Sequence, residues 1–126
     1  MKPGELVVAL YKSGEYVAEV VQWDQPKSKV RVLAVLKHPK QGDLHHPHQA
    51  DVAMFHQRRA LAYREVANVF TSQLKPYEGG EAPDYKASLQ SALQREMDEM
   101  KRLDNEFGRR SLIELESLSK DYGFEA

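Results

Sequence analysis

The sequence of 126 residues contains no cysteine. Disulfides, thiolate zinc sites, a cysteine nucleophile and a lipid attached to an N-terminal cysteine are therefore excluded. No apolar run approaches the roughly 20 residues that a membrane-spanning helix needs. Residues 1–5 are not followed by an apolar region long enough for a signal peptide. These absences lead us to expect a cytoplasmic protein that is not a lipoprotein.

A strong charge of either sign is lacking as well, because the formal net charge is -1. Residues 1–80 hold 11 Lys and Arg against 8 Asp and Glu, whereas residues 81–126 hold 7 against 11. The excess of basic residues in the first segment is too small to indicate a nucleic-acid-binding domain, since such domains are usually far more basic. The opposite balances do suggest two segments with separate surfaces.

Short β-branched and alternating runs, separated by turn residues, fill residues 1–80. We expect strands over residues 4–11, 15–23, 29–36 and 60–69, with residues 74–80 closing the β part. A tight turn at Ser13-Gly14 would join the first two strands, because glycine tolerates a positive φ. The regular spacing of these short strands predicts a meander that closes into a small barrel.

After Gly79-Gly80, where we place the division between the two parts, the apolar period becomes that of a helix. One stripe consists of Tyr85, Leu89, Leu93, Met97 (or Glu96), Met100 and Leu103, and a second of Leu112, Leu115, Leu118 and Tyr122. The break between them predicts an antiparallel helical hairpin over residues 81–126, whose second helix begins at Ser111 or at Asn105. Because neither helix can bury its stripe alone, the hairpin packs on the barrel or on a partner subunit, and we expect a possible homodimer through the helices.

A long polar loop, residues 37–51, separates the third expected strand from the fourth, and such a loop often carries the function of a small β domain. Its nitrogen and oxygen donors for zinc or nickel are His45, His46, His48, Asp43 and Asp51. Their spacing matches no established set of metal ligands, and Pro47 separates two of the imidazoles. A metal-binding protein built on the three histidines is therefore kept as an alternative, and no cofactor is expected.

Neither a nucleophile in a strained turn nor a phosphate-binding glycine loop is recognisable, so we expect a protein that is not an enzyme. The pair Arg58-Arg59, with Lys37 and Lys40, is a candidate anion-binding surface. The aromatic residues of the expected strands are Tyr11, Tyr16, Trp23 and Tyr63. They leave a nucleic-acid-binding barrel as a second alternative. Carboxylates on the neighbouring strands oppose binding to phosphates, so no nucleic acid is expected.

Five stretches have an unusual order and spacing when taken together. They are YKSGEY (residues 11–16), VLAVLKHP (32–39), QGDLH (41–45), FHQRRALAYRE (55–65) and KPYEG (75–79). These stretches resemble the kinase-associated protein B family of spore-forming bacilli, abbreviated KapB and also called kinase-associated lipoprotein B. The resemblance covers nearly the whole chain. It implies an SH3-like small β-barrel followed by helices, in agreement with the pattern of mainly β plus α structure above.

The resemblance also implies a role beside a membrane sensor histidine kinase that feeds the sporulation phosphorelay, and it supplies no catalytic residue. The lipoprotein label does not fit this chain, which has no cysteine. We therefore expect a non-enzymatic regulatory protein that binds this kinase or another phosphorelay protein, and that the kinase can bring to the membrane. The candidate partner-binding residues are Lys37, His38, Asp43, His45, Arg58 and Arg59.

Overall fold

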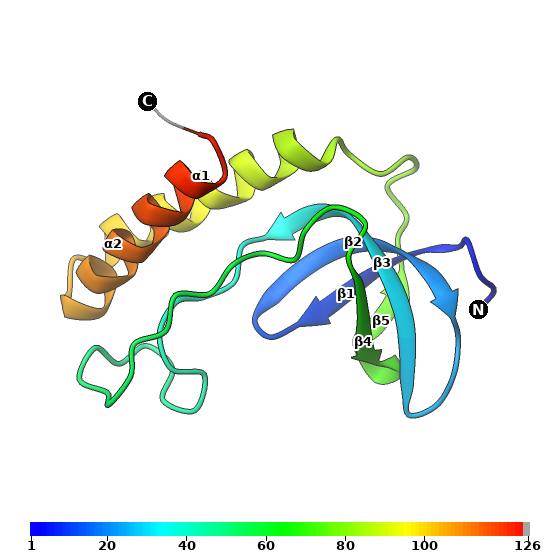
Figure 1. The fold of residues 1–126 in the computed structure, drawn as a ribbon, viewed down its shortest axis with the longest axis horizontal. Coiled ribbons are helices and arrows are strands. Elements are labelled where there is room, and N and C mark those ends of the chain that lie inside the picture. Colours follow the sequence, from blue (N-terminus) through cyan, green and yellow to red (C-terminus); the bar gives the residue numbers. More distant parts are fainter. Residues whose placement is uncertain (125–126) are drawn as a thin grey trace.

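The computed structural model describes residues 1–124. Its strands are β1 (Leu6–Tyr11), β2 (Gly14–Gln22), β3 (Lys27–Lys37), β4 (Val66–Phe70) and β5 (Leu74–Pro76), with the 3-10 turn η1 (Thr71–Gln73) between the last two. Its helices are α1 (Tyr85–Leu103) and α2 (Glu106–Asp121), which lie side by side next to the sheet (Figure 1). The expected fold class, a β part followed by a helical hairpin, is confirmed. Within the described residues, neither helix combines the length and apolarity needed to span a lipid bilayer.

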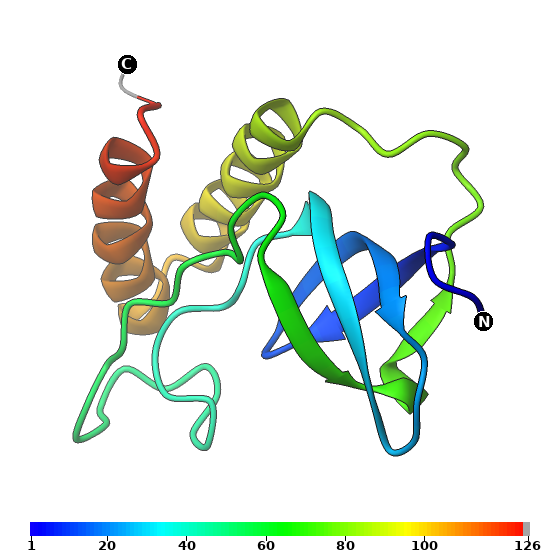
Figure 2. The same ribbon diagram turned by 45° about the vertical axis from the view of Figure 1, so that its right-hand side comes forward.

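The strands form one antiparallel five-stranded sheet in the order β4-β3-β2-β1-β5. Strands β4 and β5 stand at opposite edges of this order, yet only the short η1 turn separates them in the chain. The two edges must therefore approach each other, and the sheet curls round as Figure 2 shows. This curled meander agrees with the small barrel that the sequence predicts.

The turn between β1 and β2 differs from the expected one. Tyr11 pairs with Gly14, so the two loop residues are Lys12 and Ser13, whose φ angles are 45° and 69°. Glycine does not supply the positive φ here. Gly14 instead begins β2, where the Tyr16 side chain packs directly against it. A Cβ on Gly14 would lie 2.6 Å from the Tyr16 hydroxyl oxygen, so a larger residue fits only if this side chain shifts. Close packing explains this glycine.

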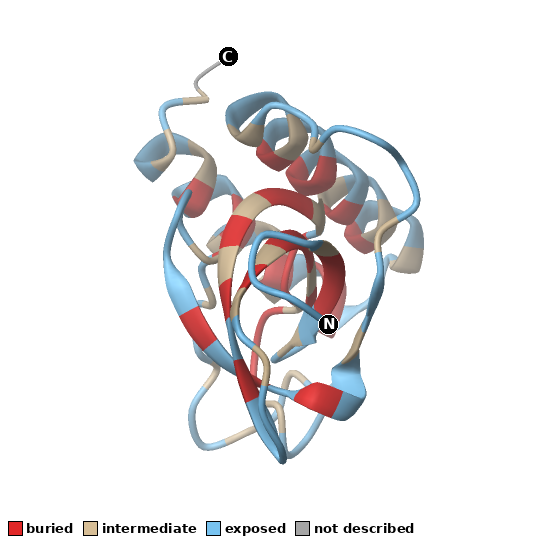
Figure 3. Cartoon of the chain, turned by 90° about the vertical axis from the view of Figure 1, so that its right-hand side faces the viewer, coloured by how far each residue is buried: buried red, intermediate tan, exposed pale blue. Residues whose placement is uncertain are grey.

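The apolar residues fall into connected layers. The curled sheet encloses Val7, Ala9, Ala18, Val20, Val30, Ala67 and Val69. A second cluster places Tyr16, Val32 and Val35 against Leu89 and Ala92 of α1, and a third joins the two helices through Leu93, Met100, Phe107 and Leu115. Figure 3 shows buried residues inside the sheet and along the facing sides of the helices. The backbone N–H of Val35 also donates to Ser88 Oγ at 2.9 Å, which ties β3 to α1.

Each helix begins at a side-chain cap. Asp84 accepts a hydrogen bond from the N–H of Ala87 at 3.0 Å. Asn105 accepts one from the N–H of Gly108 at 2.7 Å, so Asn105 is the observed start of the second helix. Gly108 lets the helices approach closely, since a Cβ there would lie 2.5 Å from the carbonyl oxygen of Met100.

The fourth strand is shorter than the sequence pattern predicts, and begins only at Val66. Arg64 has a φ of 68°, and the carbonyl of Ala62 accepts a hydrogen bond from Glu65 N at 3.1 Å. This turn redirects the chain before it can pair along β3. Val32 still exchanges hydrogen bonds with residues 64 and 65, at 2.7 and 2.9 Å. The expectation of a strand across residues 60–69 is therefore wrong for its first half.

Candidate binding surface

Residues 38–65 join β3 to β4 and contain no helix or strand. This connecting segment leaves the sheet, runs past the start of α2 and returns, as Figures 1 and 2 both show. Arg110 of α2 donates to the carbonyl oxygen of Ala50, and the Phe107 ring lies 6.0 Å from the ring of Phe55. The segment therefore docks on the helical hairpin.

His38 begins the connecting segment and is fully buried. Its Nδ1 lies 2.9 Å from the carbonyl oxygen of Pro39, and its Nε2 lies 3.0 Å from the hydroxyl of Tyr122. The same hydroxyl oxygen accepts a hydrogen bond from Ala60 N at 3.0 Å. Burial lowers the pKa of His38 to about 4, and a neutral ring protonated on Nδ1 satisfies every contact. The sequence analysis placed His38 at a partner-binding surface, but the structure places it inside, where it joins the segment to the end of α2.

The amide of Gln41 holds the two arms of the segment together. Its Nε2 donates to the carbonyl oxygens of Pro39 and Arg58, at 3.1 and 2.9 Å. Its Oε1 accepts from Arg58 N at 2.9 Å, and Arg58 Nε donates to the carbonyl of Gly42 at 3.0 Å. Gly42 has a φ of 99°, and a Cβ on it would lie 2.9 Å from the ring of Phe55. Side chains thus supply here the pairing that a β ladder supplies in the sheet.

Two of the exposed histidines of the segment, His45 and His46, are hydrogen-bonded to Asp43. Its carboxylate accepts hydrogen bonds from His45 N at 2.9 Å and from His46 Nδ1 at 3.1 Å. The bond from the backbone of His45, followed by that from the His46 ring, lowers the pKa of Asp43. His48 lies elsewhere, with its ring 5.3 Å from that of Phe107. In residues 1–124, no three acidic or histidine side chains come close enough together to hold a metal ion.

The basic pair of the segment borders a hollow beside the turn between β1 and β2. Arg58, Arg59 and Lys12 are among the residues that line this hollow, whose volume is about 430 Å³. The Arg59 guanidinium lies 3.4 Å from Asp121 Oδ2 and 5.2 Å from the centre of the Tyr122 ring. We call this basic corner the arginine hollow. Lys12 and Arg59 are exposed and Arg58 is half-buried, while the hydrogen bonds from the Gln41 side chain fix the backbone of Arg58.

Lys37 does not belong to the arginine hollow. It lines a separate hollow of about 400 Å³ between the end of β3 and α1, together with Lys40 and Glu96. Lys40 Nζ lies 3.0 Å from Glu96 Oε1, and Glu96 is only 5% exposed. Of the two residues that the helical stripe left open, Glu96 is thus the buried one, and Lys40 compensates its charge. The basic residues grouped by the sequence analysis therefore face two different hollows.

Three residues of this region were not anticipated. Lys12 lies at the turn beside Arg58 and Arg59, Gln41 clamps the segment, and the hydroxyl of Tyr122 bonds His38. The QGDLH motif contained Gln41 but gave no indication that its side chain is buried. Tyr122 was expected only as an apolar residue of a helical stripe. The role of its hydroxyl could be recognised only once the fold brought the end of α2 next to His38, 84 residues earlier in the chain.

The similarity to known proteins extends over both the barrel and the helical hairpin. A sequence model described as "Kinase associated protein B" (KapB) matches residues 11–123. The chain is 44% identical over 119 residues to the kinase-associated lipoprotein B of Bacillus subtilis (strain 168), which covers 94% of this chain and 92% of that protein. The X-ray crystal structure of kinase-associated protein B from Bacillus cereus matches with a TM-score of 0.84 at 43% identity, covering 98% of each chain. Fold and sequence therefore point to the same group of proteins.

Proposed function

Because this chain belongs to the kinase-associated protein B family, we propose that it is a non-enzymatic accessory protein that binds a sensor histidine kinase of the sporulation phosphorelay. The association with a kinase is supported by the names of its relatives in Bacillus subtilis and Bacillus cereus. The arginine hollow is the surface that we assign to this binding. A second phosphorelay protein could occupy the same surface, and the experiment below distinguishes the two.

The observation that carries this assignment is the way in which Arg58 and Arg59 are held. Gln41 fixes the backbone of Arg58 through both its N–H and its carbonyl, and Tyr122 fixes the backbone of Ala60, the residue after Arg59. A surface whose backbone is fixed before binding loses less conformational entropy when a partner docks. Arginine side chains are also enriched among the residues that dominate binding energy in protein interfaces.

The charge of this corner indicates what it contacts on the kinase. Two guanidinium groups and the ammonium of Lys12 border the hollow, and Glu65 is the carboxylate among its lining residues. The Glu65 carboxylate already accepts a hydrogen bond from Ala62 N at 2.8 Å. We therefore expect an acidic patch on the cytoplasmic part of the kinase, whose charge complements the hollow and speeds association.

The test is co-purification of the full-length kinase, in detergent-solubilised membranes, with tagged protein carrying Arg58→Glu and Arg59→Glu. We expect at least a tenfold loss of captured kinase. The adjacent basic pair Lys101-Arg102 is exposed on α1, so Lys101→Glu with Arg102→Glu is the matched control and should capture kinase normally. The soluble fraction of the same cells, captured in the same way and probed for the other phosphorelay proteins, shows whether one of them is the partner instead.

Folding of the variants must be verified separately, since Arg58 also donates to Gly42 within the segment. The single change Arg59→Glu avoids this hydrogen bond, because Arg59 contacts the Asp121 carboxylate and the Tyr122 ring at the surface. A folded Arg59→Glu protein should lose most of the captured kinase. Full capture by both arginine variants, or equal loss in the lysine–arginine control, would remove the arginine hollow from the mechanism.

A further inference from the structure

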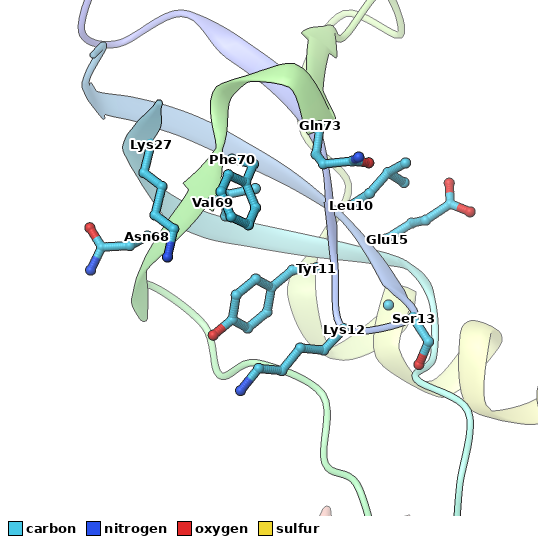
Figure 4. A pocket seen from close by; sticks show the side chains of 11 residues that line it. Leu10, Tyr11, Lys12, Ser13, Glu15, Lys27, Asn68, Val69, Phe70 and Gln73 are labelled. Carbon is cyan, nitrogen blue, oxygen red and sulfur yellow. The ribbon is translucent and has the colours of Figure 1, made fainter. Parts of the chain in front are cut away.

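A second groove lies on the other side of the turn between β1 and β2, and has a volume of about 680 Å³. Figure 4 shows its walls, which come from the end of β1, the start of β3 and the end of β4. Leu10 and Phe70 are 39% and 53% exposed, and both line it. The other large apolar side chains that are exposed lie outside its lining, in the connecting segment, on α2, near the N-terminus and at the start of β4. This groove is therefore the one place where such side chains gather on the sheet.

Ammonium groups lie over the aromatic rings of the groove. Lys27 Nζ is 4.7 Å from the centre of the Phe70 ring, and Lys12 Nζ is 5.3 Å from the centre of the Tyr11 ring. Lys27 and Phe70 are directly opposite each other in the β3–β4 pairing, so the backbone register fixes this contact. Within residues 1–124, neither lysine forms an ion pair. Both positive charges are thus left to an external partner.

The one carboxylate of the groove does not cancel these charges. In Figure 4 the Glu15 side chain points away from Tyr11 and Phe70, toward the side of Leu10. The amide of Asn68 is exposed next to Lys27, and adds a hydrogen-bond donor to the basic side. The groove therefore has a cationic side, with rings below the ammonium groups, and an opposite side that holds Leu10 and the Glu15 carboxylate.

The backbone of the turn gives independent support. Lys12 and Ser13 both have a positive φ, which asparagine and glycine adopt at lower cost in such two-residue turns. Ser13 has a structural reason to be there, because its Oγ accepts a hydrogen bond from Lys40 N at 2.9 Å. Within residues 1–124 the Lys12 side chain makes no hydrogen bond, and its ammonium lies over a half-buried ring at the rim of the groove. Strained residues of this kind gather at binding sites.

We propose that this groove binds an acidic peptide segment of a partner protein in an extended conformation. Its carboxylates would pair with Lys12 and Lys27, and an apolar side chain between them would pack on Phe70 and Leu10. Two ammonium groups and one carboxylate make the groove itself basic, so a second copy of it would be repelled. Two cations are also too few to track a nucleic-acid backbone. The proposal does not depend on which protein supplies the segment.

The test uses the full-length chain and a fluorescent peptide that alternates glutamate with leucine and phenylalanine. Lys12 and Tyr11 also line the arginine hollow, so the decisive variants are Lys27→Glu and Phe70→Ala, which alter the second groove alone. We expect each to weaken peptide binding at least tenfold, and added salt to weaken it in the unchanged protein. Lys75, exposed on β5 outside the groove, supplies the matched control Lys75→Glu, which should bind normally.

Amide chemical shifts locate the peptide and monitor the fold in the same experiment. Shifts should move at Leu10, Lys27 and Phe70, while the spectra of the variants keep the dispersion of the unchanged protein. Equal or tighter binding of a lysine-substituted peptide, or of a neutral proline-rich peptide, would overturn the proposal. So would shifts at these residues that depend on protein concentration without peptide, since they would identify a second copy as the occupant.

The two proposals, kinase binding at the arginine hollow and peptide binding at the second groove, can be contradicted independently of each other. If charge reversal of Arg58 and Arg59 abolishes kinase capture but leaves peptide binding intact, the groove stands as a distinct site. If Lys27→Glu and Phe70→Ala leave peptide binding unchanged, the groove proposal is overturned whatever the kinase result. Lys27→Glu and Phe70→Ala are expected to fold, because Lys27 and Phe70 are exposed.

Discussion

The barrel and the connecting segment satisfy their backbone groups in different ways. In the barrel, neighbouring strands pair with each other, and apolar residues alternate toward a common interior. Residues 38–65 have no such ladder. Polar side chains, above all those of the buried His38 and Gln41 and of the half-buried Tyr122, bond the backbone of this segment instead. Two kinds of interior therefore lie next to each other in one small protein.

This difference determines where a binding surface can form. Pairing along a strand gives every residue the same extended geometry, whereas side-chain ties can hold an irregular backbone in one particular shape. The segment can therefore present Arg58 and Arg59 at a fixed corner that no strand would produce. The hydrogen bonds that create this shape are few, so each of them should matter to stability more than an average surface contact.

The largest expected effect is at Tyr16, where the two regions meet. Its ring is 1% exposed in the apolar layer under α1, and its hydroxyl accepts a hydrogen bond from Leu61 N at 3.2 Å. Burial raises the pKa of this hydroxyl. Tyr16→Ala should lower the free energy of unfolding by about 4 kcal/mol, because it leaves a cavity and an unpaired N–H. Urea denaturation measures the loss.

Two further variants separate the contributions at this junction. Tyr16→Phe keeps the ring and removes only the bond to the segment, so it should cost about 1 kcal/mol. Tyr63 is 55% exposed, and Tyr63→Ala should change stability by no more than about 0.5 kcal/mol. Equal losses in Tyr16→Phe and Tyr16→Ala would mean that the hydroxyl, and not the apolar layer, joins the two regions.

Most of the barrel and the helical hairpin could be predicted, because the residue patterns that specify their strands and helices are local in the sequence. The alternation around Val32 indicated β3, and the three- and four-residue spacing after Asp84 indicated both helices. The length of the fourth strand was overestimated, because the turn at Arg64 depends on hydrogen bonds with Val32, which is distant in sequence. Local pattern cannot report a partner that only the fold brings close.

The same reason explains why the candidate site was only partly predictable. The sequence identified the segment and its basic pair, and it placed His38 among the exposed residues. The side chain that His38 contacts, Tyr122, is 84 residues further along the chain. A buried histidine and an exposed one have the same local pattern, since both stand among polar residues and prolines. Burial of a polar side chain depends on long-range packing, which one sequence does not display.

The next largest effect should appear as a dependence of stability on pH. The pKa of His38 falls to about 4 in the folded protein because of burial, whereas an unfolded histidine titrates near 6.5. The unfolded state therefore binds more protons between these values. Stability should be constant above about pH 6.5 and fall as the pH decreases toward 4, by up to about 3 kcal/mol.

The variant His38→Gln isolates this contribution, because glutamine does not titrate. Unfolding in urea at pH 7.5 and 5.5 should show a drop of roughly 1.4 kcal/mol in the unchanged protein that is absent from the variant. The exposed His45, His46, His48 and His56 remain in both proteins and cancel in the difference. The same drop in both would show that folding does not lower the pKa of His38 and that other groups cause the pH dependence.

A smaller effect is expected from Gln41→Leu, which keeps the size of a side chain that is only 3% exposed. It leaves the N–H and the carbonyl of Arg58 without their partner, at a cost of about 2 kcal/mol. Amide hydrogen exchange should accelerate at Arg58 more than in β2. Gln57 makes only long hydrogen bonds to Glu114, at 3.3 and 3.4 Å, so Gln57→Leu is the matched control and should be nearly neutral. Uniform acceleration throughout the sheet would show that the segment has no stability of its own.

The smallest expected effect is a gain in stability, whereas the preceding variants lose stability. Ser111 of α2 is fully buried, but within residues 1–124 its Oγ has no hydrogen-bond partner. It therefore resembles the polar residues of the connecting segment in burial but not in bonding. Ser111→Ala removes a desolvated hydroxyl and increases helix propensity, so it should raise the free energy of unfolding by about 0.5 kcal/mol. Urea denaturation measures the change. A loss of stability would contradict the prediction, because it would mean that the buried Ser111 hydroxyl stabilises the fold as the bonded polar side chains of the connecting segment do.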